Sequence, residues 1–253
     1  MPVIRLRDVI LGKGRPAICV PLSERTEDGL RFSLQRMKDH RFDIIEWRAD
    51  SFEALYDPAG VEKAAGIIRD AFPEKPLIFT IRTNLDMGDY EISDERYKNL
   101  NYYAIEHRLA DLIDIEFRRG KGIVRDMTDI AHANGLVLIC SWHERDSTPP
   151  AETILDTLLE METAGADIVK YAAMPRSAED VLALMEATLR FSTRDGAAPV
   201  VTMSMGRAGM ISRISGGLTG SCMTFASAGV STAPGQMPCG ILGGILDVLE
   251  DKT

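Results

Sequence analysis

Short apolar runs alternate with longer amphipathic stretches along the whole chain. Eight runs are almost continuously aliphatic, which is typical of parallel strands covered by helices. These predicted strands span residues 17–22, 43–48, 77–82, 112–117, 136–142, 167–172, 199–204 and 221–226. Between them, apolar residues recur near every third or fourth position, which predicts amphipathic helices. The predicted helices span residues 27–40, 61–72, 94–109, 123–134, 151–164, 178–190 and 240–249.

The order and spacing of these segments predict a closed barrel. Successive strands begin roughly 22–35 residues apart, which is about the length of a βα unit. Eight strands without a GxGxxG sequence after the first favour a (β/α)8 TIM barrel over an open dinucleotide-binding sheet. Residues 3–11 predict a short N-terminal hairpin that caps the barrel floor. Because no linker-like segment interrupts the pattern, we expect residues 1–253 to form one barrel domain.

Local signals also place several helix ends. Ser93 and Ser177 are each followed closely by acidic residues, which predicts N-caps, because a serine hydroxyl accepts a bond from a free amide of the first turn. Gly135 and Gly165 stand where two predicted helices end, a position at which a left-handed glycine is common.

The chain is acidic, with a net charge of −9. A nucleic-acid partner usually needs a basic face, and no run rich in lysine and arginine stands out, so we expect no such partner. An acidic protein repels anions at long range, so an anion site in it would need locally concentrated arginines. No apolar run is long enough to span a bilayer, and the N-terminus lacks the apolar core of a signal peptide. We therefore expect a cytoplasmic protein without a membrane partner.

The active site of an α/β barrel lies at the C-terminal ends of its strands, and this rule distinguishes a candidate active-site lysine from the other lysines of the chain. Lys170 alone lies inside a predicted strand, whereas the other seven lie in helices, turns or the terminus. Burial and nearby cations lower a lysine pKa, and a neutral amine is the form that attacks a carbonyl carbon. The alternative is a structural lysine–carboxylate pair, and position alone does not decide between the two.

The histidines differ in the same way. His143 directly follows the predicted strand 136–142, whereas His40, His107 and His132 lie on or beside predicted helices. Imidazole titrates near neutral pH, so His143 is the candidate for moving protons in both directions. A single histidine at the barrel top and the absence of HExxH predict no metal site. The four scattered cysteines form no CxxC pair and predict buried thiols.

Arginines stand near the ends of several predicted strands. Arg48 and Arg82 end the second and third strands, and Arg213 follows the seventh. Glu46 and Arg48 share one face of their strand, so both point into the barrel or both point outward. Guanidinium groups bind carboxylates through paired hydrogen bonds, so these side chains predict an anion-tolerant pocket. The alternative is an internal network of ion pairs with carboxylates such as Asp114.

Two segments predict loops over the same face of the barrel. Residues 206–209 follow the seventh strand and residues 231–236 follow the eighth. Both segments are rich in small and polar residues, which suits either a lid over the site or an ordinary βα connection. Met203 and Met205 alternate on the seventh strand, so one of its faces can line a pocket.

Taken together, eight segments of this chain resemble the type I 3-dehydroquinate dehydratase family. Each segment alone is weak, but the same order over almost the whole chain makes the resemblance highly specific. The segments are Glu-Trp-Arg-Ala-Asp (46–50), Phe-Thr-Ile-Arg (79–82), Asp-Ile-Glu (114–116), Ser-Trp-His (141–143), Gly-Ala-Asp-Ile-Val-Lys (165–170), Thr-Met-Ser-Met-Gly (202–206), Gly-Met-Ile-Ser-Arg (209–213) and Ala-Pro-Gly-Gln (233–236).

The resemblance implies a metal-free syn dehydration of 3-dehydroquinate to 3-dehydroshikimate, a hydro-lyase reaction of the shikimate pathway. Lys170 would form an imine with the C3 ketone. His143 would remove a C2 proton and then protonate the departing C1 hydroxyl, with Asp86 as an acidic neighbour. No cofactor is implied beyond the covalent imine, and the family implies a homodimer.

The resemblance also implies the substrate contacts. The carboxylate would be held by Arg213 and Gln236. The ring hydroxyls would be held by Glu46, Arg48 and Arg82. The lid would carry Thr232 where the family typically has serine. The walls would be Met203, Met205, Phe225 and Ala233. Pro21 stands where relatives can have a serine that contacts the substrate, and we expect no such contact from a proline side chain.

Two other functions also fit part of the pattern. The first is another Schiff-base barrel enzyme of the aldolase type that acts on a different keto substrate. If that substrate were a phosphorylated sugar, a phosphate site would be needed after strands seven and eight, whereas Arg213 and Gln236 favour a carboxylate. A non-catalytic sensor of a shikimate-pathway acid would need neither Lys170 nor His143 at these positions.

Overall fold

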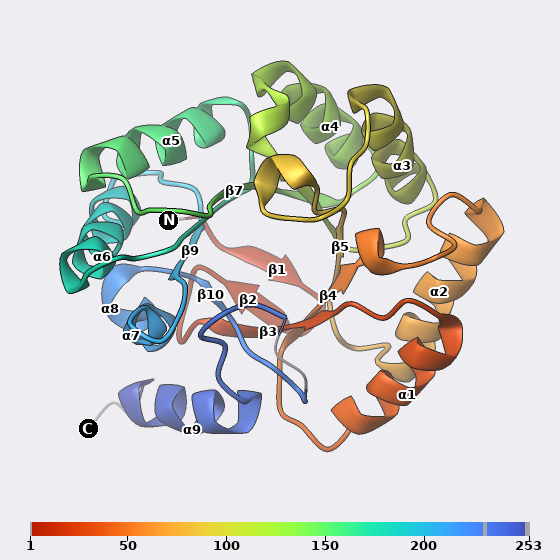
Figure 1. The fold of residues 1–253 in the computed structure, drawn as a ribbon, viewed down its shortest axis with the longest axis horizontal. Helices are drawn as coiled ribbons and strands as arrows, with labels where there is room; N and C mark the ends of the chain where they lie inside the picture. The colour runs from red at the N-terminus through yellow and green to blue at the C-terminus, as the bar shows by residue number, and fades with distance from the viewer. Residues whose placement is uncertain (1, 230–231, 251–253) are drawn as a thin grey trace.

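The computed structural model describes residues 2–229 and 232–250, and it contains the predicted barrel (Figure 1). Eight strands form one parallel sheet in the order β10-β3-β4-β5-β6-β7-β8-β9. Their bounds are β3 Ala17–Leu22, β4 Ile44–Arg48, β5 Leu77–Thr80, β6 Leu112–Glu116, β7 Val137–Glu144, β8 Ile168–Ala173, β9 Val200–Ser204 and β10 Met223–Phe225. A parallel bridge between Val200 and Ser221 joins the two edges and closes the barrel.

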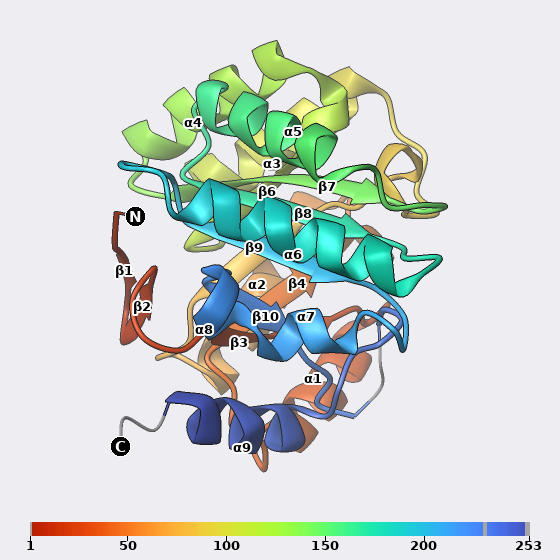
Figure 2. The ribbon, with the colours of Figure 1, turned by 90° about the vertical axis from the view of Figure 1, so that its left-hand side faces the viewer.

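Helices cover the outside of this barrel (Figures 1 and 2). The long helices are α1 Glu27–Met37, α2 Pro58–Ala71, α3 Asp94–Glu106, α4 Lys121–Ala133, α5 Ala151–Thr163, α6 Ala178–Ser192 and α9 Cys239–Glu250. The predicted caps are confirmed, because the Ser93 and Ser177 hydroxyls accept bonds from amides of the first turn. Gly135 and Gly165 have positive φ angles after α4 and α5, as predicted.

The N-terminal hairpin is also confirmed. Strands β1 Ile4–Leu6 and β2 Val9–Leu11 pair antiparallel and form a separate two-stranded sheet. The hairpin lies at one end of the barrel, opposite the end toward which the barrel strands run (Figure 2). Leu6 and Leu11 are buried against the apolar residues that fill the lower barrel interior, such as Ile44 and Ile168. Burial of these leucines anchors the hairpin as a floor.

Alternation along each strand decides which side chains reach the interior. On β8, Ile168 and Ala172 pack inside the barrel, whereas Val169 and Tyr171 pack against the helices. Lys170 therefore points inward, because alternate residues of a strand share a face. The same alternation turns the even-numbered residues of β4 inward. The direction of these side chains, which the sequence left open, is thus decided by the closed sheet.

Several predicted boundaries are wrong by a few residues. β7 continues through Glu144, because His143 and Glu144 still pair with β8. β5 ends at Thr80, since the Arg82 amide donates to the Asp50 carboxylate at 3.0 Å instead of to a neighbouring strand. Two short helices, α7 Met210–Ile214 and α8 Gly216–Thr219, lie between β9 and β10 and were not predicted. Their length of about one turn is too short to give a periodic signal.

Candidate active site

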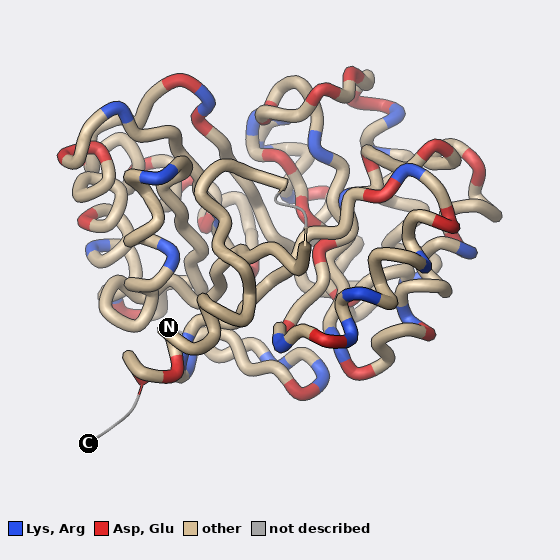
Figure 3. The backbone as a smooth tube through the Cα atoms, turned by 60° about the horizontal axis from the view of Figure 1, so that its bottom comes forward, with Lys and Arg blue, Asp and Glu red and all other residues tan. Residues whose placement is uncertain are grey.

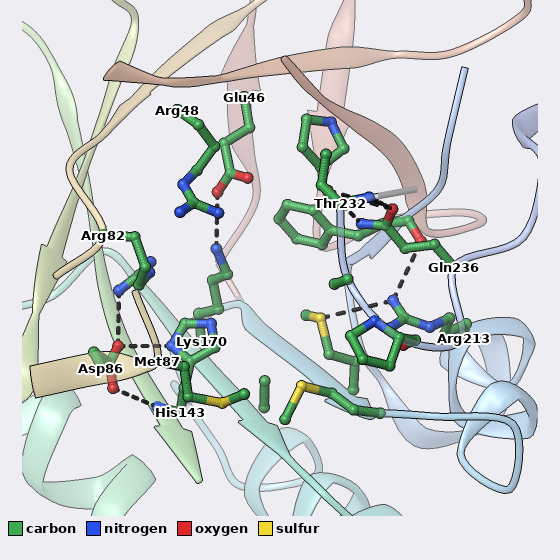
Figure 4. Close-up of a pocket in the computed structure, with 17 residues that line it drawn as sticks. Glu46, Arg48, Arg82, Asp86, Met87, His143, Lys170, Arg213, Thr232 and Gln236 are labelled. Atoms are coloured by element: carbon green, nitrogen blue, oxygen red, sulfur yellow. Dashed lines mark hydrogen bonds and ion pairs between the residues drawn. The ribbon is translucent and has the colours of Figure 1, made fainter. Parts of the chain in front are cut away.

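The C-terminal ends of the barrel strands surround a cavity of about 200 Å³. All thirteen residues that the sequence singled out line this cavity, although they come from almost every strand end of the barrel. Arg82, Asp86 and His143 lie on one side of Lys170, and Arg213, Thr232 and Gln236 lie on the other side (Figure 4). The structure therefore brings the predicted site together, while the role of each residue stays a prediction.

Lys170 lies at the centre of this cavity with two carboxylate partners. Its Nζ atom donates to Glu46 Oε1 at 3.0 Å and to Asp114 Oδ2 at 3.1 Å, and it lies 4.5 Å from the ring centroid of Phe225. The side chain is only 5% exposed. Both hypotheses drawn from the sequence thus describe part of what Lys170 does: it forms a buried ion pair, and its side chain faces a cavity.

The direction of the Lys170 pKa corrects the expectation of a lowered value. Burial by itself lowers the pKa, but the negative charges of Asp114 and Glu46 outweigh it, so the pKa of Lys170 is raised above its ordinary value. Lys170 is therefore an ammonium group in the resting protein. Before it can attack a carbonyl carbon it must release a proton, and the two carboxylates within 3.1 Å are its hydrogen-bond partners in the resting protein.

His143 is held by Asp86 through both its backbone and its ring. The amide of His143 donates to Asp86 Oδ1 at 2.7 Å, and the ring Nδ1 lies 2.6 Å from Asp86 Oδ2. This contact leaves Nε2 for proton transfer in the cavity. Burial lowers the pKa of His143 and outweighs Asp86, which raises it. The imidazole is therefore neutral at neutral pH and ready to accept a proton.

Arg82 belongs to an internal ion-pair network, which was the alternative reading of the strand-end arginines. Its guanidinium group donates to Asp86 at 2.7 Å, to Asp114 at 2.8 Å and to the Ser141 hydroxyl at 2.9 Å. Burial by itself raises the pKa of Asp114, but Arg82 and Lys170 reverse this and lower it. Arg82 therefore links the surroundings of the lysine to those of the histidine.

Arg213 has a different environment on the opposite wall. Its guanidinium group donates to the carbonyl oxygens of Phe225 at 3.2 Å and Pro234 at 3.1 Å, and no carboxylate partner is found among the described residues. Its Nε atom is buried without a hydrogen-bond partner. Burial lowers the pKa of Arg213 to about 10. A buried cation that no carboxylate in residues 2–229 and 232–250 neutralises makes this wall a place for an anion to bind.

Comparison with known families agrees with this arrangement. The family model described as type I 3-dehydroquinase matches residues 18–253.

The chain belongs to the type I 3-dehydroquinase family.

Related proteins match this chain along its full length. A 3-dehydroquinate dehydratase of Syntrophotalea carbinolica is 39% identical over 253 residues, which cover all of both chains. One of Neisseria gonorrhoeae is 42% identical and covers 98% of this chain and 97% of its own. A crystal structure of the Clostridium difficile type I enzyme, with covalent modified comenic acid, has a TM-score of 0.94 at 34% identity and covers 98% of each chain.

The two predicted loops contact each other at the cavity. The Gly206 amide donates to the Pro234 carbonyl at 3.1 Å. Gly235 has φ +78, and a Cβ atom there would lie 2.3 Å from the Gly206 carbonyl oxygen, so only glycine fits this contact. The Thr232 amide donates to Gln236 Oε1 at 2.9 Å, which orients the glutamine at the cavity edge. Ser231, part of the predicted loop, lies outside the described residues.

Several cavity residues were missed by the sequence reasoning. Met87, Ala172 and Pro234 also line the cavity, and so does Pro21, which was set aside for its lack of a polar side chain. Ala172 could have been inferred, since it lies two residues after Lys170 on the same strand face. Met87 follows a single 3-10 turn, η2 Asn84–Asp86, and has a left-handed φ of 74, for which the sequence gives no signal.

Arg118 lies behind the histidine and was also missed. It lies in η3 Phe117–Arg119, just after β6. Its guanidinium group donates to the His143 carbonyl at 3.1 Å, pairs with Glu144 at 3.2 Å, and stacks 3.8 Å above the Trp142 ring centroid. These contacts hold the end of β7 and place Glu144, the last residue of that strand, beside Arg118.

No group of His, Cys, Asp and Glu side chains in residues 2–229 and 232–250 is arranged to hold a metal ion. Helices long and apolar enough to cross a membrane are likewise not found in this part of the chain. All four cysteines are buried free thiols, as predicted.

Proposed function

We propose that the protein dehydrates 3-dehydroquinate to 3-dehydroshikimate in the shikimate pathway, through an imine on Lys170 and without a cofactor. The observation that carries this proposal is the buried Lys170 side chain in one cavity with a neutral imidazole and with Arg213, a cation that has no carboxylate partner among the described residues. An amine and a proton shuttle are what an elimination beside a ketone requires. The uncompensated arginine suits a substrate that carries a carboxylate.

The reaction begins when the Lys170 amine attacks the C3 carbonyl carbon. Glu46 or Asp114 takes the ammonium proton and returns it to the C3 oxygen, which takes a second proton from the nitrogen and leaves as water, so that a protonated imine forms. The two carboxylates face this cation, as they face the ammonium group at 3.0 and 3.1 Å in the resting protein. Because the positive charge stays in one place, the site needs little reorganisation during imine formation.

His143 then moves the protons. Its Nε2 atom removes a C2 proton, which is acidified because the protonated imine accepts the electrons as an enamine. The enamine expels the C1 hydroxyl, which takes the proton back from His143 and leaves as water. Asp86 at 2.6 Å stabilises the imidazolium that exists between the two steps. Water finally hydrolyses the imine and frees 3-dehydroshikimate and Lys170.

The remaining cavity residues position the substrate in this proposal. Arg213 and Gln236 hold the carboxylate. The ring hydroxyls meet Glu46, Arg48 and Arg82. The walls and lid are Met203, Met205, Phe225, Thr232 and Ala233. Arg48 is held ready by two bonds to Asp50 at 2.9 and 2.8 Å. The homodimer and the cytoplasmic location stay predictions.

Trapping the imine tests the proposal directly. We expect incubation with 3-dehydroquinate and borohydride to leave a stable adduct on Lys170, located by intact mass and peptide mapping. A Lys170→Met variant should give no adduct. Lys121→Met is the matched control, because Lys121 is exposed and pairs with Glu160 on the outer helices, and it should give the adduct in full. Turnover by Lys170→Met would contradict the imine, whereas no adduct and no turnover in the unmodified protein would contradict this substrate.

The pH dependence of kcat/KM tests the role of His143. Because burial lowers its pKa, the acid limb should lie below the ordinary histidine value of about 6.5. Activity is present while the imidazole is neutral and is lost as the pH falls through this lowered pKa. Asp86→Asn removes a charge that raises the pKa, so its acid limb should move to still lower pH.

A second carboxylate gives the control for this experiment. Glu62→Gln removes the partner of the exposed His107, which lies 3.0 Å away on the outer helices, and should leave the profile unchanged. An acid limb at or above about 6.5, or one that moves upward in Asp86→Asn, would show that His143 is not the group that titrates.

A further inference from the structure

A second cavity, of about 710 Å³, opens at the barrel floor, at the opposite end from Lys170. Its lining comes from the β1–β2 hairpin, from α2 and from the C-terminal ends of α3 and α4. Four of the lining residues are arginines: Arg5, Arg7, Arg69 and Arg108. Elsewhere on the outer helices and loops, basic and acidic residues are interspersed (Figure 3). This floor cavity is a local concentration of arginines in an acidic chain.

The arginines of the floor cavity outnumber their counterions. Asp111 is the one carboxylate among the lining residues, and it binds Arg69 at 2.6 Å and Arg7 at 3.2 Å. The side chains of Arg5 and Arg108 have no hydrogen bond or ion pair with any described residue. Two guanidinium groups are thus held in place by Asp111, and two others are open to a ligand.

Arg108 occupies a left-handed backbone position that residues with side chains disfavour. Arg108 has a φ of 49 at the end of α3, whereas the equivalent positions of α4 and α5 hold Gly135 and Gly165. All three helices end with the same amide-to-carbonyl bond across the turn: Leu109 to Ala104, Leu136 to Ala131 and Ala166 to Met161. A left-handed residue with a side chain is strained, so glycine is the usual choice in this motif.

Arg7 repeats this feature. It has a φ of 50 in the two-residue turn that joins β1 to β2, where glycine or asparagine is favoured. Among the described residues, three other than glycine have a positive φ: Arg7, Arg108 and Met87. Met87 lines the active-site cavity, and the other two are arginines of the floor cavity. Backbone strain concentrates at functional sites, so this distribution points to a ligand.

We propose that the floor cavity binds a small polyanion that carries phosphate or carboxylate groups. Arg5 and Arg108 bind it through paired hydrogen bonds of their guanidinium groups, and Arg7 and Arg69 add positive charge from behind. The ligand connects the hairpin to α2 and α3, so it stabilises the folded barrel in proportion to its occupancy. This inference does not depend on the reaction proposed above.

The test measures thermal unfolding and calorimetric binding with pyrophosphate and with citrate, at an ionic strength matched by chloride. We expect one of the two to raise the Tm of the unmodified protein and to saturate, and the one that does so identifies the ligand chemistry. Arg108→Gly should unfold at a higher temperature than the unmodified protein without ligand, because glycine relieves the strain. The same variant should bind the ligand at least tenfold more weakly. If Arg108→Gly raises the Tm but weakens binding, then Arg108 serves to bind the ligand and not to stabilise the fold.

Two further variants keep the test decisive. Arg25→Gln removes one charge from an arginine that is 78% exposed and pairs with Glu53 away from the floor, and it should keep the full response. Arg5→Gln alters an exposed strand residue, so it should weaken binding tenfold without lowering the Tm. If Arg108→Gly lowers the Tm, the Arg5→Gln variant decides whether the floor cavity binds the ligand. Equal Tm shifts in all variants, or no shift in the unmodified protein, would overturn the proposal.

Discussion

Lys170→Met should lower kcat for 3-dehydroquinate by about 10⁴- to 10⁶-fold, since loss of a covalent nucleophile removes the whole pathway and not one contact. Methionine has a similar length but cannot form an imine, so no electron sink is available for the C2 proton. Steady-state kinetics with enough enzyme to measure the residual rate gives the value. A loss of less than about tenfold would show that the reaction does not pass through this lysine.

The stability of this variant has to be measured with its activity. Lys170 neutralises two buried carboxylates, and removal of one partner from a buried ion pair costs about 3–5 kcal/mol. Asp114 keeps its bond to Arg82 at 2.8 Å, so we expect the loss to fall mainly on Glu46. Circular dichroism and thermal unfolding should show a folded barrel with a lowered Tm. Lys121→Met should match the unmodified protein in both activity and Tm.

His143→Gln should lower kcat by about 10²- to 10⁴-fold, the range for loss of a general acid–base group. Its effect differs in kind from that of Lys170→Met, because the amine is still present. The variant should still form the imine, so borohydride should trap an adduct on Lys170 even though turnover is slow. Rapid quenching followed by mass analysis measures both quantities on one sample.

The double variant then separates the two roles. If the lysine and the histidine act in one pathway, adding His143→Gln to Lys170→Met should cost little more than Lys170→Met alone. Normal turnover in His143→Gln would assign proton transfer to another group. Failure to trap an adduct in His143→Gln, when the unmodified protein gives one, would mean that the histidine is already needed to form the imine.

The barrel itself could be predicted because its signals are local. Apolar runs and amphipathic stretches identify strands and helices within a few residues, and their alternation leaves few topologies. The filter that selected Lys170 and His143 uses this same information, since it needs only a strand and its direction. The boundary errors lie where tertiary hydrogen bonds override local periodicity or where an element is too short to show any. The Arg82 amide donates to Asp50 instead of to a neighbouring strand, and the helices α7 and α8 are only about one turn long.

The electrostatics of the site could not be predicted in this way. The pKa of Lys170 depends on Glu46 and Asp114, which lie 124 and 56 residues away in sequence. Burial alone pointed to a lowered pKa, and the two carboxylates reverse its direction. The contacts of Arg118 with the end of β7 and the arginines of the floor cavity likewise join separate segments of the chain. A pKa sums charges over space, and neighbours in space are known only when the barrel has closed.

By itself, therefore, the sequence determined the barrel, the order of its strands and one well-placed candidate each for the amine and the imidazole, because these follow from patterns within single segments. The tertiary structure alone decided that Lys170 points inward, that it is charged at rest and that Arg213 lacks a counterion among the described residues. These properties depend on which distant segments lie side by side. Closure of the parallel sheet is the physical event that brings them together.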